Sequence, residues 1–284
     1  MILEIILSTF FLSTTTSTSG AQEAVENQDS LALVNAVRWE KGDNGISRAA
    51  FSLRLFDVPA TISIARYPMS GFRTSIVDCQ DTLATATSVT ASRYSALAAV
   101  NGSFFDMKKL TPVTYFYKDG FEIYSEAPGR TNVTDALLCI GGNGHDIAVI
   151  KADTVAYASQ KEQFSQILAA GPLLVQGGRA CAIDTTIRFN LAKAPRTVLG
   201  HDGKEVWMIV IDGRFPDTAV GTTIPQTALV CKWLGLKEAI NLDGGGSSTL
   251  WLSDTGVMNH PCDNHTWDHN GERRVPNIIV CNKK

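Results

Sequence analysis

The chain has 284 residues, of which 44% are hydrophobic and 19% are charged. This is enough to build a full core and excludes a generally disordered chain. The formal net charge is −3 at pH 7. The scattered Lys and Arg residues argue against a nucleic-acid partner, and no basic run marks a membrane surface. We therefore expect a glycan or another small molecule as the partner, and the oligomeric state stays open.

Residues 1–30 are expected to precede the folded domain as a signal peptide and a polar linker. The segment MILEIILSTFFLSTTTSTSGAQ has an apolar stretch too short to span a bilayer, then small residues ending at Ser19-Gly20-Ala21, as export signals do. No Lys or Arg precedes the apolar stretch, and Glu4 lies within it. An artefact of cloning or of the start site is the alternative. If the segment is a signal peptide, we expect a periplasmic or extracellular protein without stable membrane insertion.

Strands dominate the first part of the folded domain. Alternating or β-branched residues followed by turn residues predict strands over residues 51–58, 60–68 and 72–79. Residues 112–126, PVTYFYKDGFEIYSE, predict a β-hairpin with Asp119-Gly120 at its tip.

The middle of the chain predicts a helix followed by a second hairpin. Residues 161–170, KEQFSQILAA, are expected to form a helix that ends at Gly171-Pro172, with a strand over 173–176. Residues 196–200 and 205–213 predict two paired strands. The second of them, EVWMIVIDG, is apolar almost throughout, so we expect it to be covered on both faces.

The last third predicts a helix, a short strand, a glycine turn and a further strand. Residues 222–236 have Thr223 as an N-cap and apolar residues at helical spacing. Strands are expected over 238–242 and 248–252. Strands that alternate with few helices in this way predict one large α+β domain over residues 31–284, with mixed, largely antiparallel sheets, rather than two domains.

The six cysteines do not indicate a metal site. No CxxC or His-rich spacing occurs, so we expect no zinc, and no motif indicates another metal or a cofactor. Cys262 and Cys281 flank a polar segment and are the pair that we expect to form a disulfide in an exported protein. Cys231 lies in an apolar helical pattern and is expected to be a buried thiol.

The stretch NLDGGGSS, residues 241–248, is the first candidate site. A triple glycine costs backbone entropy unless close backbone approach or a positive φ is required. Backbone N–H groups after a buried strand can form an anion-binding concavity, and Ser247 and Ser248 add hydroxyl donors. A tight turn capped by Asp243 is the alternative. The stretch is neither a Walker motif nor GxGxxG.

Two arginines support an anion site. Arg196 follows Pro195 at the start of a predicted strand, and Arg214 lies just after the apolar strand together with Asp212. Guanidinium groups bind phosphate through two parallel hydrogen bonds. A surface ion pair between Asp212 and Arg214, which would contribute little, is the alternative.

Other polar residues follow strand ends. Asn101 ends an apolar strand and Asp106 follows five residues later, as residues of a pocket often do. Asn101-Gly102 as a plain turn is the alternative. Three histidines near the C-terminus have no acid or base partner by spacing and are expected at the surface: His260, His265 and His269.

The motifs VNGSFFD, GPLLV, PRTVLG, VIDGR, TALVCKWLG and AINLDGGGSSTLW, in this order, resemble the phosphodiester glycosidase family over about residues 95–280. The resemblance implies hydrolysis of a sugar-1-phosphodiester to free sugar and a phosphomonoester. Ser103, Ala194 and Gln226 depart from residues common in the family. The matching polar positions are Asn101, Asp106, Arg196, Asp212, Arg214, Asn241, Asp243, Gly244, Gly245, Gly246, Ser247 and Ser248.

Roles follow from residue chemistry and the resemblance together. Asp243 is the first candidate for the carboxylate at the sugar carbon, with Asp212 or Asp106 as the second catalytic carboxylate. Arg196 is expected to assist catalysis at the phosphate. The remaining matching positions are expected to bind substrate. Two alternatives stay open: a glycan-binding module without turnover, and a phosphodiesterase that attacks phosphorus with a hard cation held by the three aspartates.

Overall fold

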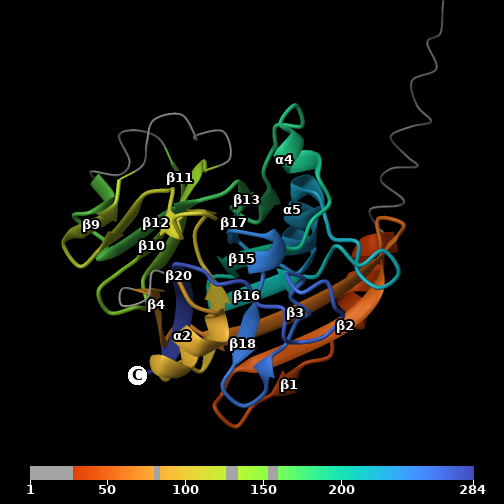
Figure 1. The fold of residues 1–284 in the computed structure, drawn as a ribbon, viewed down its shortest axis with the longest axis horizontal. Coiled ribbons are helices and arrows are strands. Elements are labelled where there is room, and N and C mark those ends of the chain that lie inside the picture. Colours follow the sequence, from red (N-terminus) through yellow and green to blue (C-terminus); the bar gives the residue numbers. More distant parts are fainter. Residues whose placement is uncertain (1–27, 80–83, 126–133, 153–158) are drawn as a thin grey trace, which may run out of the picture.

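An eight-stranded antiparallel sheet forms the centre of the fold in this computed structural model, which describes residues 28–79, 84–125, 134–152 and 159–284. The sheet combines strands from distant parts of the sequence (Figure 1). Their spatial order is β1 (Glu40–Lys41), β2 (Ser47–Leu55), β3 (Val58–Pro68), β16 (Glu205–Ile211), β15 (Arg196–His201), β17 (Glu238–Asn241), β13 (Leu173–Gln176) and β14 (Arg179–Ala180).

Two five-stranded antiparallel sheets and a short pair complete the β structure. The first sheet has the order β11 (Ile147–Lys151), β10 (Ala136–Ile140), β12 (Gln166–Ala170), β8 (Phe116–Lys118) and β9 (Phe121–Tyr124). The second has the order β19 (Gly256–Val257), β18 (Leu250–Leu252), β5 (Ala98–Asn101), β20 (Asn277–Lys283) and β4 (Phe72–Asp78). The pair is β6 (Phe105–Asp106) and β7 (Thr111–Pro112).

Helices are few and short. Besides the helical residues 28–36 and 159–160, the helices in the described ranges are α2 (Thr87–Arg93), α4 (Arg188–Leu191), α5 (Ile224–Trp233) and the 3₁₀ turn η1 (Gly245–Ser247). The predicted α+β class with largely antiparallel sheets is therefore confirmed. None of the helices in the described ranges is long and apolar enough to cross a membrane.

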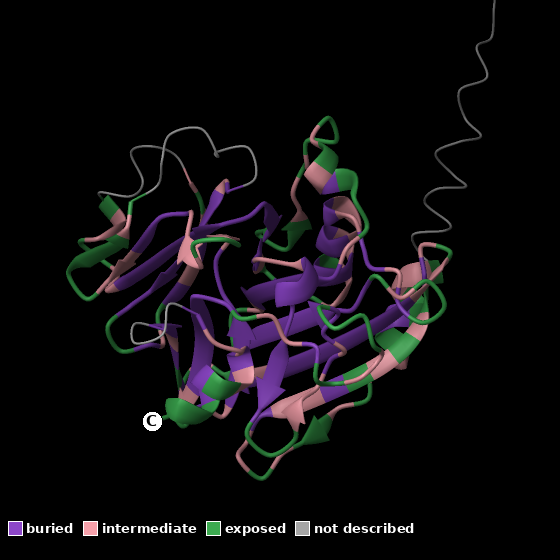
Figure 2. Cartoon of the chain, in the orientation of Figure 1, coloured by how far each residue is buried: buried purple, intermediate pink, exposed green. Residues whose placement is uncertain are grey.

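Strand β16 explains why the central sheet holds together. Its even-numbered residues, such as Met208, pack in the cluster shared with the five-stranded sheets, and its odd-numbered residues, such as Ile209, pack in the cluster under α5. Side chains of a strand alternate between faces, so an uninterrupted apolar run is buried on both. Figure 2 shows β15 and β16 buried, whereas the outer strands β1 and β2 are partly exposed. This confirms the prediction for residues 205–213.

Helix α5 begins as the sequence predicts. Thr223 Oγ1 accepts a hydrogen bond from Gln226 N at 3.3 Å, and Gln226 Oε1 accepts one from Thr223 N at 3.0 Å, which makes a capping box. The helix is followed by Gly235 at φ +87°, a left-handed conformation that glycine adopts without strain. Both predicted hairpins, β8 with β9 and β15 with β16, are also confirmed.

The predicted helix over residues 161–170 is wrong, because its second half is strand β12. Ile167 and Ala169 face one buried cluster, and Leu168 and Ala170 face another. A short apolar run that is buried on both sides has no periodicity to separate strand from helix, so its pairing with β10 and β8 decides.

The predicted disulfide between Cys262 and Cys281 is also wrong. Both are free, as are the other four cysteines. Cys281 lies within β20 in the core shared with Tyr67, whereas Cys262 lies in a loop beside Arg214. The two side chains therefore lie in different environments, one in the core and one in a loop. Cys231 is a buried free thiol, as predicted.

Candidate active site

The triple glycine lies where three neighbouring segments approach the loop, one against each glycine. A Cβ atom on Gly244 would lie 2.6 Å from the carbonyl oxygen of Pro195. One on Gly245, which has φ +65°, would lie 2.8 Å from Arg214 Nη2. One on Gly246 would lie 2.3 Å from Asp263 Oδ1 and 2.5 Å from Arg273 Nη2. Each of these separations is too short for a Cβ unless the neighbouring atoms move, and at Gly244 those atoms are backbone.

Asp243 introduces this loop and is half-buried. Its Oδ1 accepts a hydrogen bond from Gly244 N at 2.9 Å. Burial raises the pKa of Asp243 to about 6, although Ser247, the Gly244 N–H and the charges of Arg273 and Arg214 oppose the shift. A carboxylate whose pKa lies close to neutral pH and that has two guanidinium groups nearby is typical of a reactive site.

Arg214 and Arg273 supply the positive charge beside Asp243. Arg214 is exposed, adopts φ +69°, and places Nη1 3.6 Å from Cys262 Sγ. Arg273 binds Asp263 through its Nε, at 3.2 Å from each carboxylate oxygen, and through Nη2 at 2.5 Å. This pairing lowers the pKa of Asp263. Both guanidinium groups therefore border the glycine loop while Asp263 neutralises part of their charge.

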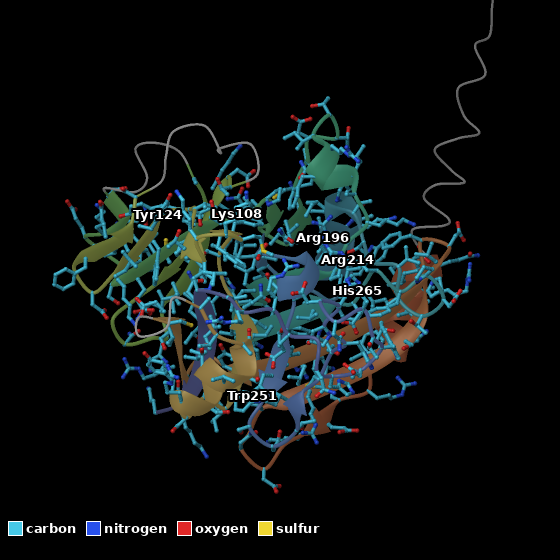
Figure 3. The ribbon with its side chains drawn as sticks, viewed as in Figure 1. Lys108, Tyr124, Arg196, Arg214, Trp251 and His265 are labelled. Atoms are coloured by element: carbon cyan, nitrogen blue, oxygen red, sulfur yellow. The ribbon has the colours of Figure 1, made fainter. Side chains whose placement is uncertain are left out.

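Arg196 differs from these two arginines because it is buried, with 1% of its surface exposed. Its Nε donates to Thr222 O at 3.0 Å, and its Nη2 donates to Ala192 O at 2.5 Å and Phe189 O at 3.5 Å. Within the described ranges no carboxylate pairs with it. Burial lowers its pKa to about 10. The guanidinium thus anchors the chain before β15, while the Arg196 backbone borders Gly244; Figure 3 labels the residue.

Two asparagines position the loop from below, and both are fully buried. Asn101 Nδ2 donates to the Asp243 carbonyl at 2.7 Å, and its Oδ1 accepts from Thr197 Oγ1 at 2.8 Å. Asn241 Nδ2 donates to Gly171 O at 2.7 Å and to Leu242 O at 2.9 Å. These contacts tie both residues to the backbone around the loop, although the buried Oδ1 of Asn241 has no hydrogen-bond partner in the described part of the chain.

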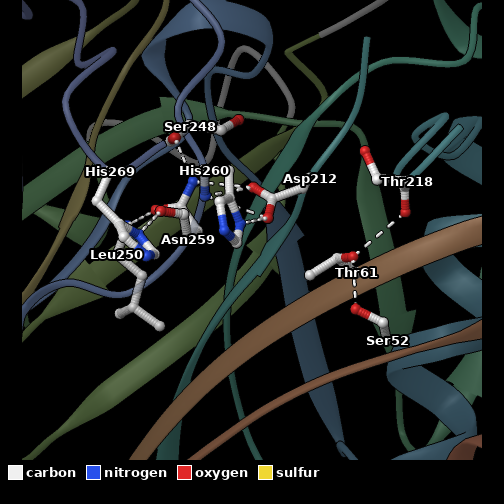
Figure 4. Close-up of polar contacts among 9 residues, drawn as sticks. All are labelled: Ser52, Thr61, Asp212, Thr218, Ser248, Leu250, Asn259, His260 and His269. Atoms are coloured by element: carbon white, nitrogen blue, oxygen red, sulfur yellow. Dashed lines mark hydrogen bonds and ion pairs between the residues drawn. The ribbon is translucent and has the colours of Figure 1, made fainter. Parts of the chain in front are cut away.

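The buried carboxylate of Asp212, at the end of β16, holds a second loop. It accepts hydrogen bonds from Asn259 Nδ2 at 3.0 Å, from His260 N at 3.1 and 3.2 Å, and from His260 Nδ1 at 3.0 Å (Figure 4). His260 also stacks on Trp267, with ring centroids 3.7 Å apart. The expectation that His260 lacks a partner is wrong: its partner is 48 residues away in the sequence, which spacing could not reveal.

The remaining predicted residues lie in two places. Asp106 Oδ1 accepts from Lys108 N at 2.8 Å and Lys109 N at 3.0 Å, which lowers its pKa and closes the turn between β6 and β7. Ser247 and Ser248 are buried directly after the glycines, and the Ser248 carbonyl accepts from Asn259 Nδ2 at 3.0 Å. The structure therefore gathers Asn101, Asp243, the glycines, the serines and Arg214 around one loop, whereas the Asp106 carboxylate caps its own turn.

Sequence reasoning missed Arg273, Asp263, His260 and Trp267. They lie in residues 260–273, a polar stretch whose histidines are predicted to lie at the surface. The unusual density of His, Asp, Trp and Arg there was the available signal. Across the described residues, no group of three or more His, Cys, Asp or Glu side chains is arranged to hold a metal ion.

Comparisons with known proteins agree with this picture. A family model described as phosphodiester glycosidase matches residues 94–281. The zebrafish N-acetylglucosamine-1-phosphodiester α-N-acetylglucosaminidase catalytic domain, auto-inhibited by its pro-peptide, superposes with a TM-score of 0.68 and 19% identity over 92% of this chain and 93% of that one. No curated protein sequence matches the chain.

Two further solved structures share the fold. A hypothetical protein from Synechocystis gives a TM-score of 0.63 at 13% identity, covering 87% of this chain and 64% of that one. A protein from Burkholderia pseudomallei K96243 that has been proposed to be exported gives 0.51 at 17% identity, covering 80% and 75%. At these identities the structural likeness concerns the fold.

Proposed function

Because the chain belongs to the phosphodiester glycosidase family, we propose that it hydrolyses a sugar-1-phosphodiester to a free sugar and a phosphomonoester. The observation that carries this proposal is the carboxylate of Asp243, which lies on a glycine loop bordered by Arg214 and Arg273. A sugar carbon that develops positive charge needs a carboxylate, and a departing phosphate needs cations or N–H donors. The loop offers both within one short segment.

The proposed roles follow the contacts. Asp243 faces the sugar carbon as its carboxylate. Arg214 and Arg273 bind the phosphate, and we assign a supporting positive charge to Arg196, whose backbone borders Gly244. A phosphate monoester is a good leaving group, so positive charge at the phosphate replaces much of the work of a strong general acid. Asn101, Asn241 and Asp212 position the loops that carry these groups.

The substrate class can be narrowed from the fold neighbour. The zebrafish protein's title specifies an N-acetylglucosamine 1-phosphodiester, so we take such a compound as the first substrate to test. We also propose that the protein is exported, because residues 1–30 have the apolar and small-residue pattern of a signal segment.

The experiment is hydrolysis of the methyl phosphodiester of α-N-acetylglucosamine 1-phosphate in ¹⁸O-labelled water, for the wild type and for Asp243→Asn. We expect free sugar carrying the label, and loss of turnover in the variant while the fold persists. Asp202→Asn is the matched control, because Asp202 also accepts two backbone N–H groups, at 2.8 Å each, but in the turn between β15 and β16.

Each other outcome identifies an alternative. Label in the phosphate would mean attack at phosphorus, and inhibition by a chelator would then support a cation-dependent phosphodiesterase. Saturable sugar binding without turnover would mean a glycan-binding module. Near wild-type turnover of Asp243→Asn would remove Asp243 from the mechanism.

A further inference from the structure

Hydrolysis also needs a group that accepts the proton of the attacking water, and the roles proposed for Asp243 and the arginines do not include one. The Asp106 carboxylate is occupied by the backbone of its own turn, and Asp212 is 1% exposed and holds three N–H groups. Asp212 is therefore too buried to act directly on water, and Asp106 already uses one carboxylate oxygen in its own turn. Asp212, however, forms a hydrogen bond with His260, whose side chain is partly exposed.

The hydrogen bonds fix the chemical state of the His260 ring. A carboxylate that accepts from several N–H groups has no proton to give, so His260 Nδ1 carries the hydrogen in its 3.0 Å contact with Asp212 Oδ2. In the neutral ring this leaves a lone pair on Nε2. A buried carboxylate that orients an imidazole in this way is the arrangement that prepares histidine as a general base.

Packing holds the ring in one orientation. Trp267 stacks on it almost parallel, at 5° and 3.7 Å between centroids, and His269 packs at 4.5 Å and 32°. His269 itself is tied to the loop, because its Nδ1 donates to Asn259 O at 2.7 Å. The His260 side chain keeps 19% of its surface exposed. The ring is therefore held by three neighbours and remains partly open to solvent.

Two contacts join the segment of residues 212–214 to the segment of residues 260–262. Asp212 bonds His260, and two residues further along each segment Arg214 contacts Cys262 at 3.6 Å. Two residues of extended chain span at most about 7 Å. Asn259 connects the same network to the glycine loop through Ser248 O, at 3.0 Å (Figure 4). The loop that carries His260 is therefore tied both to the segment of Arg214 and to the glycine loop.

We propose that His260 is a catalytic residue whose Nε2 takes the proton of the attacking water, and that Asp212 is the positioning residue that fixes its tautomer. This inference rests on the proposed glycosidase function. The bond between the sugar carbon and the phosphate oxygen breaks, and its electron pair stays on the phosphate. The water oxygen forms the new bond to that carbon, and its proton moves to Nε2 and then to solvent.

The test compares His260→Asn with the wild type on the sugar-1-phosphodiester. The amide of asparagine can take the place of Nδ1–H and keep the hydrogen bond to Asp212, but it cannot accept a proton. We expect kcat to fall by about 100-fold or more, with KM and Tm close to the wild type. The pH profile of kcat/KM should change shape, while the rise near pH 6 assigned to Asp243 stays.

Four charged or titratable residues neighbour His260 in space or along the two connected segments. Asp212 and His269 contact the ring, and Arg214 and Asp263 lie two and three residues away along the two segments. His265→Asn is the matched control, since His265 is exposed on the same loop at φ +58°, a conformation that asparagine tolerates. This variant should keep activity within about two-fold and keep the wild-type pH profile.

A second readout separates catalysis from loop clamping. Imidazole ¹⁵N shifts should report the Nδ1–H tautomer of His260 in the wild type and a mixture of tautomers in Asp212→Asn. Unchanged kcat and pH profile in His260→Asn, with an active wild type, would overturn this inference alone. A parallel loss of Tm and rise of KM would reduce His260 to a structural role. A wild type that releases no sugar would overturn the proposed function itself.

Discussion

Asn101 Nδ2 donates a 2.7 Å hydrogen bond to the main-chain carbonyl of Asp243, so one buried amide joins the end of β5 to the start of the glycine loop. The same side chain accepts from Thr197 Oγ1 at 2.8 Å and from Thr249 N at 3.2 Å. It therefore connects β5, β15 and both ends of the loop. The position of the Asp243 carboxylate depends on a residue that does not itself need to touch substrate.

Asn101→Ala should lower both stability and activity. It leaves buried partners of three hydrogen bonds unsatisfied, and we expect the free energy of unfolding to fall by about 2–4 kcal/mol. In the folded fraction, kcat/KM should fall at least about ten-fold because the Asp243 backbone is released. Urea unfolding and steady-state kinetics would measure these effects.

Asn282→Ala is the comparison, because the Asn282 amide also bonds two carbonyls, Tyr94 O and Ser95 O, but at the surface. It should cost less than about 1 kcal/mol and leave kcat/KM unchanged. Equal effects of the two variants would contradict the loop-positioning function of Asn101.

The raised pKa of Asp243 predicts a specific dependence of stability on pH. Folding raises this pKa to about 6, above the unfolded value of about 4. The folded state then binds the proton more tightly than the unfolded state. The free energy of unfolding therefore falls as pH rises from about 4 to about 6, by at most about 3 kcal/mol. Above pH 6 the loss is complete, and below pH 4 it is absent.

Asp243→Asn should remove this dependence while keeping the hydrogen bond from Gly244 N. In urea unfolding, the variant should match the wild type near pH 4 and exceed it above pH 6. Wild-type kcat/KM should rise through pH about 6 as the carboxylate ionises. A stability difference that does not change between pH 4 and pH 8 would contradict the raised pKa.

Local patterns predicted the fold well where one residue pattern allowed one structure. The apolar run of β16, the Thr223 cap of α5 and the turn at Asp119-Gly120 each depend on neighbours in the sequence, and each was predicted correctly. The helix prediction over residues 161–170 was wrong because Gln166–Ala170, which forms β12, is buried on both faces. Burial on both faces removes the periodicity on which that prediction depended.

The candidate site was predictable only in part, for a related physical reason. The glycine loop carries its own signal, since three glycines in a row are costly without close contacts. The pairing of Asp212 with His260, and of Asp263 with Arg273, is created by the folding of distant segments. No spacing rule connects residue 212 to residue 260, so these partners were visible only in three dimensions.

Gly244 and Gly246 should differ when each is changed to alanine. In Gly244→Ala the new Cβ would meet the Pro195 carbonyl at 2.6 Å, and the backbone cannot easily move away. We expect a loss of about 1–3 kcal/mol in the free energy of unfolding. In Gly246→Ala the colliding atoms are the ends of the Asp263 and Arg273 side chains, which can be displaced.

Gly246→Ala should therefore fold with a Tm near the wild type but lose at least about ten-fold in kcat/KM, because the displaced Arg273 no longer borders the loop. Thermal unfolding of both variants, followed by kinetics, separates the two effects. If Gly246→Ala instead lost stability as Gly244→Ala does, the Asp263–Arg273 pair would be a rigid part of the fold rather than a movable group.

Arg196 tests whether a buried guanidinium can serve the fold and the substrate together. Arg196→Lys keeps the charge but loses the planar group that reaches Thr222 O and Ala192 O. We expect the free energy of unfolding to fall by about 1.5–3 kcal/mol, since hydrogen bonds from a charged donor are lost. The buried charge has no carboxylate partner among the described residues, so a bound phosphate would compensate it. The variant should therefore lose more kcat/KM on the sugar-1-phosphodiester than on an aryl glycoside of the same sugar, whereas equal losses on both substrates would restrict Arg196 to anchoring the chain before β15.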